Sequence, residues 1–242
     1  MQIDKKKCVG CKKCNPYCTV GAISIVEWEA KKKSEVDQKA CVECGACLRS
    51  EVCPKDAIFM PELKWTRIVR AQFGNPYYGH SGVKGVAPPP EIKLNDITNR
   101  ILPGVADFVL EMGRPGISTS FRDVQTVCTA LAKAGVTVEP GGPVAAIMED
   151  LDTGKLKDDI LEERALNVMV HFRLDYDRLR PGLKVLKDVA AEIDTVFSLS
   201  LVNRVEKDGS TPALPIAVEE GFQTDAYPKT NVGLGRLQEA AK

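Results

Sequence analysis

The chain has 242 residues, of which 44% are hydrophobic and 27% are charged, a composition typical of one large globular domain or two smaller ones. Lysine plus arginine equals aspartate plus glutamate at 33 each, so the overall charge favours neither nucleic acid nor a membrane surface as partner. The N-terminal sequence lacks the apolar stretch of a signal peptide, and nowhere do about 18 uncharged apolar residues follow one another. We therefore expect a cytoplasmic protein without a membrane segment.

The cysteines are concentrated at the N-terminus, where eight of the nine lie before residue 54. A secreted disulfide scaffold is a short chain whose cysteines are spread through the fold. Reduced thiolates that hold metal fit this distribution better.

Residues 1–60 contain an internal repeat, in which the segment from Asp4 aligns with the segment from Asp37. The first three cysteines shift by 33 positions and the fourth by 35, because "LRSEV" is two residues longer than "NPY". Each half ends in a short apolar segment, "AISIV" or "AIFM", that predicts a strand. Two such halves paired about a pseudo-twofold axis form a small α+β domain with the cysteines on its inner loops.

The spacing of the cysteines points to a metal site. Two C-x2-C pairs satisfy a tetrahedral zinc ion, but each half here has a third cysteine at the same spacing. The run C-x2-C-x2-C winds one loop around a cubane, so that local thiolates meet three corners and a distant cysteine meets the fourth. Zinc ribbons and a single cluster remain the alternatives.

These runs resemble those of the bacterial two-cluster ferredoxins, C-x2-C-x2-C-x3-C-P, and the resemblance covers residues 1–60. In that family the fourth cysteine of each run ligates the other cluster. The resemblance implies two [4Fe-4S] clusters. One would use Cys8, Cys11, Cys14 and Cys53, and the other would use Cys41, Cys44, Cys47 and Cys18.

Two departures from the family pattern stand out. The proline after the fourth cysteine is present at Pro54 but replaced by Thr19 in the first run, and the second run has C-x5-C. We expect the longer loop before Cys53 to bulge and to change solvent access and hydrogen bonding at the Cys8 cluster, which are determinants of its potential.

The charge of residues 1–60 is also unusual for a ferredoxin. They carry eleven Lys/Arg and eight Asp/Glu, and two oxidised clusters of about −2 each bring the total to about −1. Freely diffusing ferredoxins tend to be strongly acidic. The lysine runs at 5–7 and 31–33 offset the cluster charge or face an acidic partner, although a solvated lysine face explains them equally well.

Residues 61–103 are rich in glycine, proline and aromatics without periodicity. They predict a long irregular connector that is either docked on the domains or functional. No glycine-rich nucleotide loop, P-loop or serine elbow occurs in the chain.

Residues 104–205 predict a second α+β domain. "GVADFVLEMG" indicates a strand, "STSFRDVQTVCTALAKAG" a helix capped by Ser118 or Ser120 and ended by Gly135, and "VTVEPGGPVAAIMEDL" a strand with a turn. "KLKDDILEERAL" indicates a short polar helix, followed by the strand "NVMVHFRL", the helix "DYDRLRPGLKVLKDVAAEI" and the strand "TVFSLSLVNRV". This order predicts a ferredoxin-like βαββαβ sandwich with both long helices on one face of a four-stranded sheet. Residues 206–242 predict an extended arm.

The stretch "LEMGRPGISTSFRDVQTVCTALAKAGVTVE" resembles the opening of ACT-type regulatory domains, in which the turn after the first strand lies at a dimer edge and binds small effectors such as amino acids. The resemblance touches Arg114, Pro115, Gly116 and the helix N-terminus at Ser118 to Ser120, whose amides suit an anionic group. It also leaves open a homo-oligomer through this domain. The plain alternative is that Pro115 and Gly116 only make the turn.

Three further side chains are less informative. Cys128 is expected to be a buried structural thiol rather than a ninth ligand. His171 lies on the strand face opposite to Val170 and Phe172 and is expected to be a surface or satisfied residue, and His80 offers only a weak case for acid/base chemistry.

Taken together, the sequence predicts an iron-sulfur electron-transfer protein, a subunit or dedicated partner of a larger oxidoreductase whose catalytic subunit is elsewhere. Eight supplied ligands leave no open iron site, which argues against catalysis by this chain. The alternatives are a redox- or ligand-sensing protein with an ACT-like effector domain, and a small redox enzyme with the connector as its substrate site.

Overall fold

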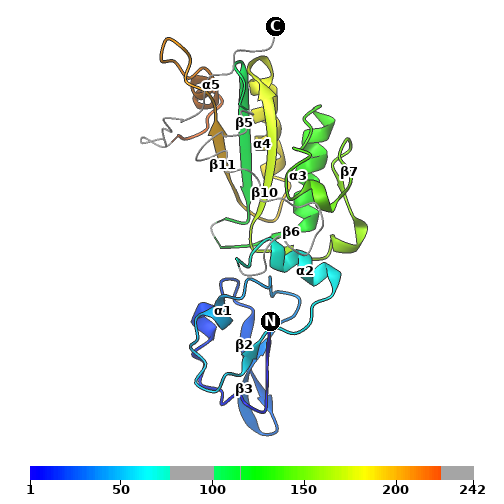
Figure 1. Ribbon diagram of the computed structural model, residues 1–242, viewed down its shortest axis with the longest axis vertical. Coiled ribbons are helices and arrows are strands. Elements are labelled where there is room, and N and C mark those ends of the chain that lie inside the picture. The colour runs from blue at the N-terminus through cyan, green and yellow to red at the C-terminus, as the bar shows by residue number, and fades with distance from the viewer. Residues whose placement is uncertain (77–100, 115, 225–242) are drawn as a thin grey trace.

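The computed structural model describes residues 1–76, 101–114 and 116–224. The molecule is elongated: residues 1–60 form an N-terminal unit at one end, residues 101–224 form a C-terminal unit at the other, and helix α2 (Trp65–Gln72) lies between them (Figure 1). Both units combine helices and strands, as predicted. None of the helices in the described ranges has the length and apolar character needed to span a bilayer.

The N-terminal unit is built from two short antiparallel ladders. Strand β1 (Gln2–Ile3) pairs with β4 (Ile58–Phe59), and β2 (Ile23–Trp28) pairs with β3 (Lys31–Val36). Ile3 faces Ile58 in one ladder, and Ile23 faces Val36 in the other. Val36 follows Ile3 by 33 positions and Ile58 follows Ile23 by 35, so the ladders are related by the sequence repeat and have the pseudo-twofold form that it predicts.

A small core fills the space between these ladders. Cysteines make up much of it, since four of the eight N-terminal thiols are buried together with the aliphatic strand residues. Its members are Met1, Ile3, Cys8, Cys14, Ala22, Ile23, Val36, Cys41, Cys47, Ala57 and Ile58. A core of this size leaves little apolar area to stabilise the fold.

Helix α2 corrects the prediction of an irregular connector over 61–103, the remainder of which, 77–100, lies outside the described residues. The helix buries Val69 and Ala71 and stacks the edge of Phe73 on Phe121, with ring centroids 5.7 Å apart. Trp65 Nε1 donates to Asp159 Oδ2 over 2.7 Å. Tertiary contacts with the C-terminal unit therefore stabilise a helix that is too short to be stable by itself.

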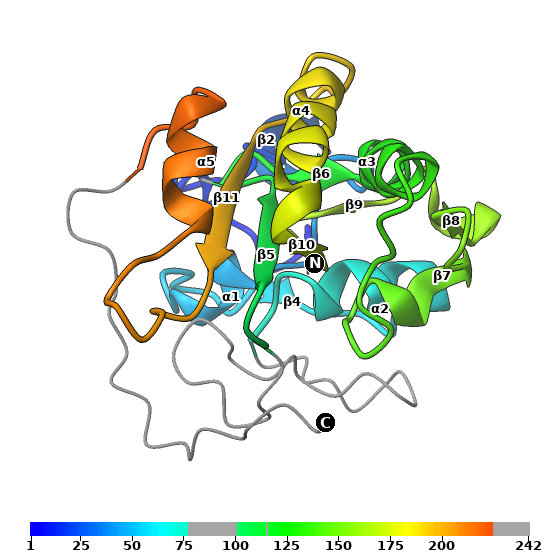
Figure 2. The same cartoon turned by 90° about the horizontal axis from the view of Figure 1, so that it is seen from above.

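The C-terminal unit has a three-stranded antiparallel sheet in the order β10 (Val168–Asp175), β5 (Val105–Met112), β11 (Phe197–Val202). Figure 2 shows α3 (Phe121–Lys133), α4 (Leu179–Ala190) and α5 (Ala213–Glu219) on one side of this sheet. Alternate residues of β5 that face the helices are fully buried, and they are Ala106, Phe108, Leu110 and Met112. The predicted strands and long helices thus form around one core.

The caps of α3 are those that the sequence predicts. Ser120 Oγ accepts a hydrogen bond from the amide of Asp123 over 3.1 Å, and Gly135 ends the helix with φ at +71°, a conformation that costs glycine little. The predicted inward positions Phe121, Val124, Val127 and Leu131 are all buried.

Three predicted elements differ in the structure. The strand expected from Val136 is reduced to a single bridge between Val138 and Phe172, because the "PGGP" sequence that follows cannot continue a ladder. The predicted polar helix at 155–166 is a 3-10 turn (η4, Asp158–Ile160) between short strands, since residues on either side of it pair with other segments. The predicted extended arm begins with α5, and residues 225–242 lie outside the described residues.

The shorter elements complete the fold. They are η1 (Asn15–Tyr17), α1 (Ala46–Arg49), β6 (Thr119–Ser120), η3 (Ala145–Ile147), β7 (Met148–Asp150), β8 (Lys155–Leu156), β9 (Arg164–Ala165) and η5 (Tyr176–Arg178).

Replacement of Phe108 by alanine tests the core of the C-terminal unit. Phe108 is fully buried and stacks on Phe172 with ring centroids 5.2 Å apart. We expect Phe108→Ala to lower the free energy of unfolding by about 3–5 kcal/mol, measured by chemical denaturation. Val205→Ala, at a side chain that is 62% exposed, is the control and should change it by less than about 0.5 kcal/mol. Equal effects of the two substitutions would contradict the assignment of this core.

Candidate metal centres

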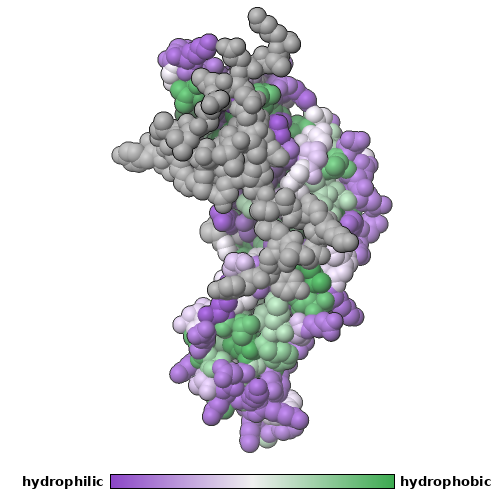
Figure 3. All heavy atoms as spheres, viewed as in Figure 1, coloured by the Kyte–Doolittle hydropathy of each residue, from purple (hydrophilic) through white to green (hydrophobic). Residues whose placement is uncertain are grey.

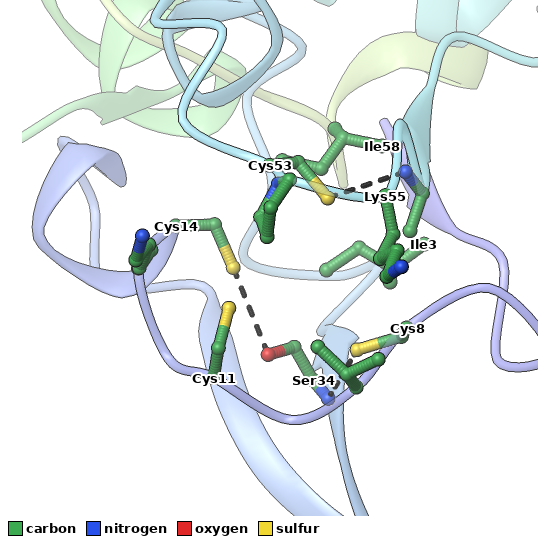
Figure 4. A pocket seen from close by; sticks show the side chains of 12 residues that line it. Ile3, Cys8, Cys11, Cys14, Ser34, Cys53, Lys55 and Ile58 are labelled. Atoms are coloured by element: carbon green, nitrogen blue, oxygen red, sulfur yellow. Dashed lines mark hydrogen bonds between the residues drawn. The ribbon is translucent and has the colours of Figure 1, made fainter.

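One pocket of the N-terminal unit brings together cysteines from both halves of the repeat. Cys8, Cys11 and Cys14 line it from the first run, and Cys53 enters from the second. Figure 4 shows the four sulfur atoms directed into a common space. The pocket lining also includes Ser34, Lys13 and Lys55, and it contains no carboxylate.

The other four N-terminal cysteines form a second set. Burial raises the pKa of the Cys47 thiol to about 12, and the neighbouring charges of Cys44, Cys41 and Cys18 act in the same direction. Cys18 therefore lies with the thiols of the second run, although it is adjacent to the first run in sequence. Over the described residues, no three or more Cys, His, Asp or Glu side chains are spaced to hold a metal ion directly.

The two cysteine loops wind in the same way. Gly10 and Glu43, which are equivalent in the repeat, have φ at +67° and +55°, and the equivalent pair Lys12 and Gly45 have φ at +63° and +70°. Each loop thus has two left-handed residues, one of which is not glycine and is strained. Such conformations persist where the surrounding structure enforces them.

Backbone amides are directed at the cysteine sulfurs. The amides of Ala22 and Ala57 donate to Cys18 Sγ and Cys53 Sγ over 3.0 and 3.2 Å, again at equivalent positions of the repeat. Cys8 Sγ accepts from the amides of Gly10 and Ser34 over 3.4 and 3.3 Å. Amide donors of this kind stabilise thiolates and tune the potential of a metal centre that the thiolates hold.

The acidity of the buried thiols depends on a nearby positive charge. Burial is the largest cause that raises the pKa of Cys14 and of Cys41. Metal binding requires thiolates, so these sulfurs ionise when a cationic centre compensates the loss of solvation. Soft sulfur donors, amide hydrogen bonds and the absence of carboxylates from the pocket lining fit an iron-sulfur group.

A buried cation contacts the first cysteine of each run, a feature that the sequence analysis missed. Lys33 Nζ donates to the carbonyl oxygen of Cys8, and the guanidinium of Arg70 donates to the carbonyl oxygen of Cys41. Lys33 belongs to β3, whereas Arg70 belongs to α2. The sequence signal for Arg70 is weak, because it is only the spacing of Arg67 and Arg70 on one side of a short helix.

The residues of the ACT-like stretch are engaged within the fold. Arg114 forms an ion pair with Glu111 over 2.7 Å, while Pro115 lies outside the described residues. At the helix start, the amide of Asp123 bonds Ser120 Oγ and that of Phe121 bonds the carbonyl oxygen of Glu163. Two of the amides that the sequence suggested for an anion therefore have partners.

The remaining predicted candidates are structural or undescribed. Cys128 is fully buried in the C-terminal core, and burial raises its pKa to about 12, as expected of an inert thiol. His171 is buried in β10 with 6% exposure, which makes it an internal rather than a surface residue. His80 lies outside the described residues.

Comparison with known proteins places residues 1–60 in the family of 4Fe-4S dicluster domains. The chain is 47% identical over 51 residues to a subunit of the ion-translocating oxidoreductase complex of Methanosarcina acetivorans, which covers 21% of this chain and 17% of that protein. It is 37% identical over 62 residues to the pyruvate synthase subunit PorD of Methanothermobacter marburgensis, covering 26% of this chain and 65% of that protein. The comparison with solved structures gave no match.

Alanine at Gly10 tests the winding of the first cysteine loop. A Cβ at Gly10 would lie 2.2 Å from the carbonyl oxygen of Lys32, whereas a Cβ at Gly21, which has nearly the same φ, meets no atom within 4 Å. We expect Gly10→Ala to destabilise the anaerobically prepared protein by about 1–3 kcal/mol more than Gly21→Ala, measured by denaturation together with the iron content. If the two variants are equally stable and retain equal iron, the close approach of Gly10 to β3 is wrong.

Proposed function

We propose that this chain is an iron-sulfur electron-transfer protein that holds two [4Fe-4S] clusters in residues 1–60. The placement of the eight thiols carries the proposal, because they separate into two sets of four and each set combines three cysteines of one run with the fourth of the other. The match of these residues to 4Fe-4S dicluster domains supports the same conclusion.

The ligand sets follow from this placement. One cluster is held by Cys8, Cys11, Cys14 and Cys53, and the other by Cys41, Cys44, Cys47 and Cys18. Such clusters supply reversible one-electron storage. The protein supplies the amide donors on Cys8, Cys18 and Cys53, and the buried cations beside the first cysteine of each run.

A complete set of thiolate ligands favours electron transfer over catalysis. Substrate chemistry at an iron-sulfur cluster needs an open iron position, and four cysteines per cluster leave none. We therefore propose that electrons pass through the chain without any bond to a substrate. The catalytic site then belongs to another protein.

The relatives favour a larger oxidoreductase as the setting. Their names identify one as a subunit of an ion-translocating oxidoreductase complex and the other as a subunit of pyruvate synthase. By this analogy, we propose that the chain is a subunit or a dedicated electron donor or acceptor of an oxidoreductase. The reaction of that enzyme is not implied by either name.

The C-terminal unit supports a role in assembly. We infer that it is a ferredoxin-like sandwich in which the fourth strand is reduced to the Val138 bridge, since the strand order and the helices on one face agree with that fold. Its ACT-type ligand binding, its oligomerisation and the cytoplasmic location of the chain stay predictions. A thermal shift with an amino acid would favour the sensor alternative, and turnover by the isolated chain would favour the enzyme.

Paired cysteine substitutions distinguish crossed from local ligation. With crossed ligation, Cys11→Ser/Cys53→Ser damages one cluster, and about four of the eight irons should remain after anaerobic reconstitution. Cys11→Ser/Cys18→Ser damages both clusters and should leave far less iron. Iron, sulfide and the spectrum of the reduced clusters measure the result, with the two single variants at positions 18 and 53 as controls. The opposite ranking of the double variants would show local ligation.

Reductive titration tests the electron-transfer function. The reconstituted full chain should take up about two electrons, one for each cluster, with bleaching of its broad visible absorption, and should return them to an oxidised viologen. The signal should be absent from protein that contains zinc instead of iron and sulfide. Failure of the iron-loaded protein to accept electrons would refute the proposed function.

A further inference from the structure

The two cysteine loops differ in their surroundings. The Cys41 loop is covered by α2 and the residues after it: Arg67 forms an ion pair with the buried Glu43, Arg70 bonds the carbonyl oxygen of Cys41, and a Cβ on Gly74 would lie 3.7 Å from Cys44 Cβ. Arg70 also pairs with Glu163 of the C-terminal unit. This side of the N-terminal unit is thus occupied by the protein itself.

The Cys8 loop is open to solvent. Val9 is 56% exposed, and Cys11, the middle cysteine of the run, is also exposed. Both line the pocket of Figure 4, and so do the exposed residues Lys13 and Lys55. An exposed ligand is the shortest route for an electron between a buried cluster and a docked protein, so the Cys8 side is the outlet of the chain.

The rim of this opening is basic. Lys13 and Lys55 line the pocket, and Lys12 is exposed next to Lys13. Within the described residues none of the three forms an ion pair, whereas Lys5 pairs with Glu35 over 2.9 Å. The acidic neighbour of Lys55, Asp56, is not part of the pocket lining. Figure 3 shows hydrophilic side chains gathered over the β2–β3 end of the unit beside an apolar area.

Resting on the function proposed above, we propose that this rim, formed by Val9, Cys11, Lys12, Lys13 and Lys55, is the docking surface for an acidic one-electron carrier protein. Lysines around an exposed apolar residue attract a carboxylate-rich surface and orient it. One electron passes between the cofactor of the carrier and the cluster of the Cys8 set, and no atom is transferred. A basic carrier would be repelled from the same rim.

Charge reversal at the rim tests this surface. The probes are an acidic flavodoxin and an uncharged quinone, each mixed in a stopped-flow experiment with the reduced, reconstituted full chain. In Lys13→Glu/Lys55→Glu the association rate with flavodoxin at low salt should fall about tenfold or more, and its salt dependence should become flat or reverse. The rate with the quinone should be unchanged.

A matched variant separates local from total charge. Lys133→Glu/Lys207→Glu makes the same change in net charge at exposed positions of the C-terminal unit, and its association rate should stay within about twofold of the parent. At high salt, where charges are screened, the rim variant should approach the parent rate. A difference that persists there comes from an altered potential and contradicts docking.

The remaining outcomes also decide the question. Equal losses in both double variants, or no loss in either, would overturn the docking surface. Normal reduction by viologen together with flavodoxin rates that ignore the rim would refute the docking surface alone, whereas absence of electron uptake from viologen would refute the proposed function with it.

Discussion

The arrangement of the N-terminal unit depends on the pairing of each half of the repeat with the other. The amide of Asp4 bonds the carbonyl oxygen of Ala57 over 2.8 Å, and the amide of Asp37 bonds that of Ala22 over the same distance. Ala57 and Ala22 also donate their own amides to Cys53 and Cys18. The same two residues therefore join the halves and position the thiol that each half gives to the other. Neither half can build its site alone, so damage to one ladder affects both thiol sets.

This symmetry is broken by the source of the buried cation beside each loop. Lys33 reaches Cys8 from within the N-terminal unit and lies over the ring of Trp28, 5.7 Å from its centroid. Arg70 reaches Cys41 from α2, and its remaining donors bond the carbonyl oxygens of Gln38 and Lys39 and the carboxylate of Glu163. A buried guanidinium needs such a set of acceptors. The Cys41 loop is consequently tied to the C-terminal unit, while the Cys8 loop is held by its own unit and stays accessible.

Sequence reasoning was most reliable where spacing has a direct geometric meaning. The 33-residue repeat predicted the two ladders, and the helical period of Phe121, Val124, Val127 and Leu131 predicted the buried face of α3. Helix α2 was missed because its eight residues owe their stability to contacts with distant residues such as Asp159 and Phe121. The partners of Arg70 were equally invisible, since Glu163 lies 93 positions away. Contacts of this kind follow from the packing of the two units and leave no local pattern.

The two extra residues of the second run show how the packing of the units gives meaning to a sequence difference. The sequence suggested that they bulge toward the Cys8 side. In the structure the longer segment forms α1, whose Arg49 donates to the carbonyl oxygen of Cys44 and to Asn75 Oδ1, the latter over 3.1 Å. The first run has only the 3-10 turn η1 at the equivalent place. Because Asn75 follows α2, the longer segment adds a second link between the Cys41 loop and the helix that contacts the C-terminal unit. The departure from the ferredoxin spacing thus acts at the covered loop, which leaves the shorter run as the face that is free to meet a partner.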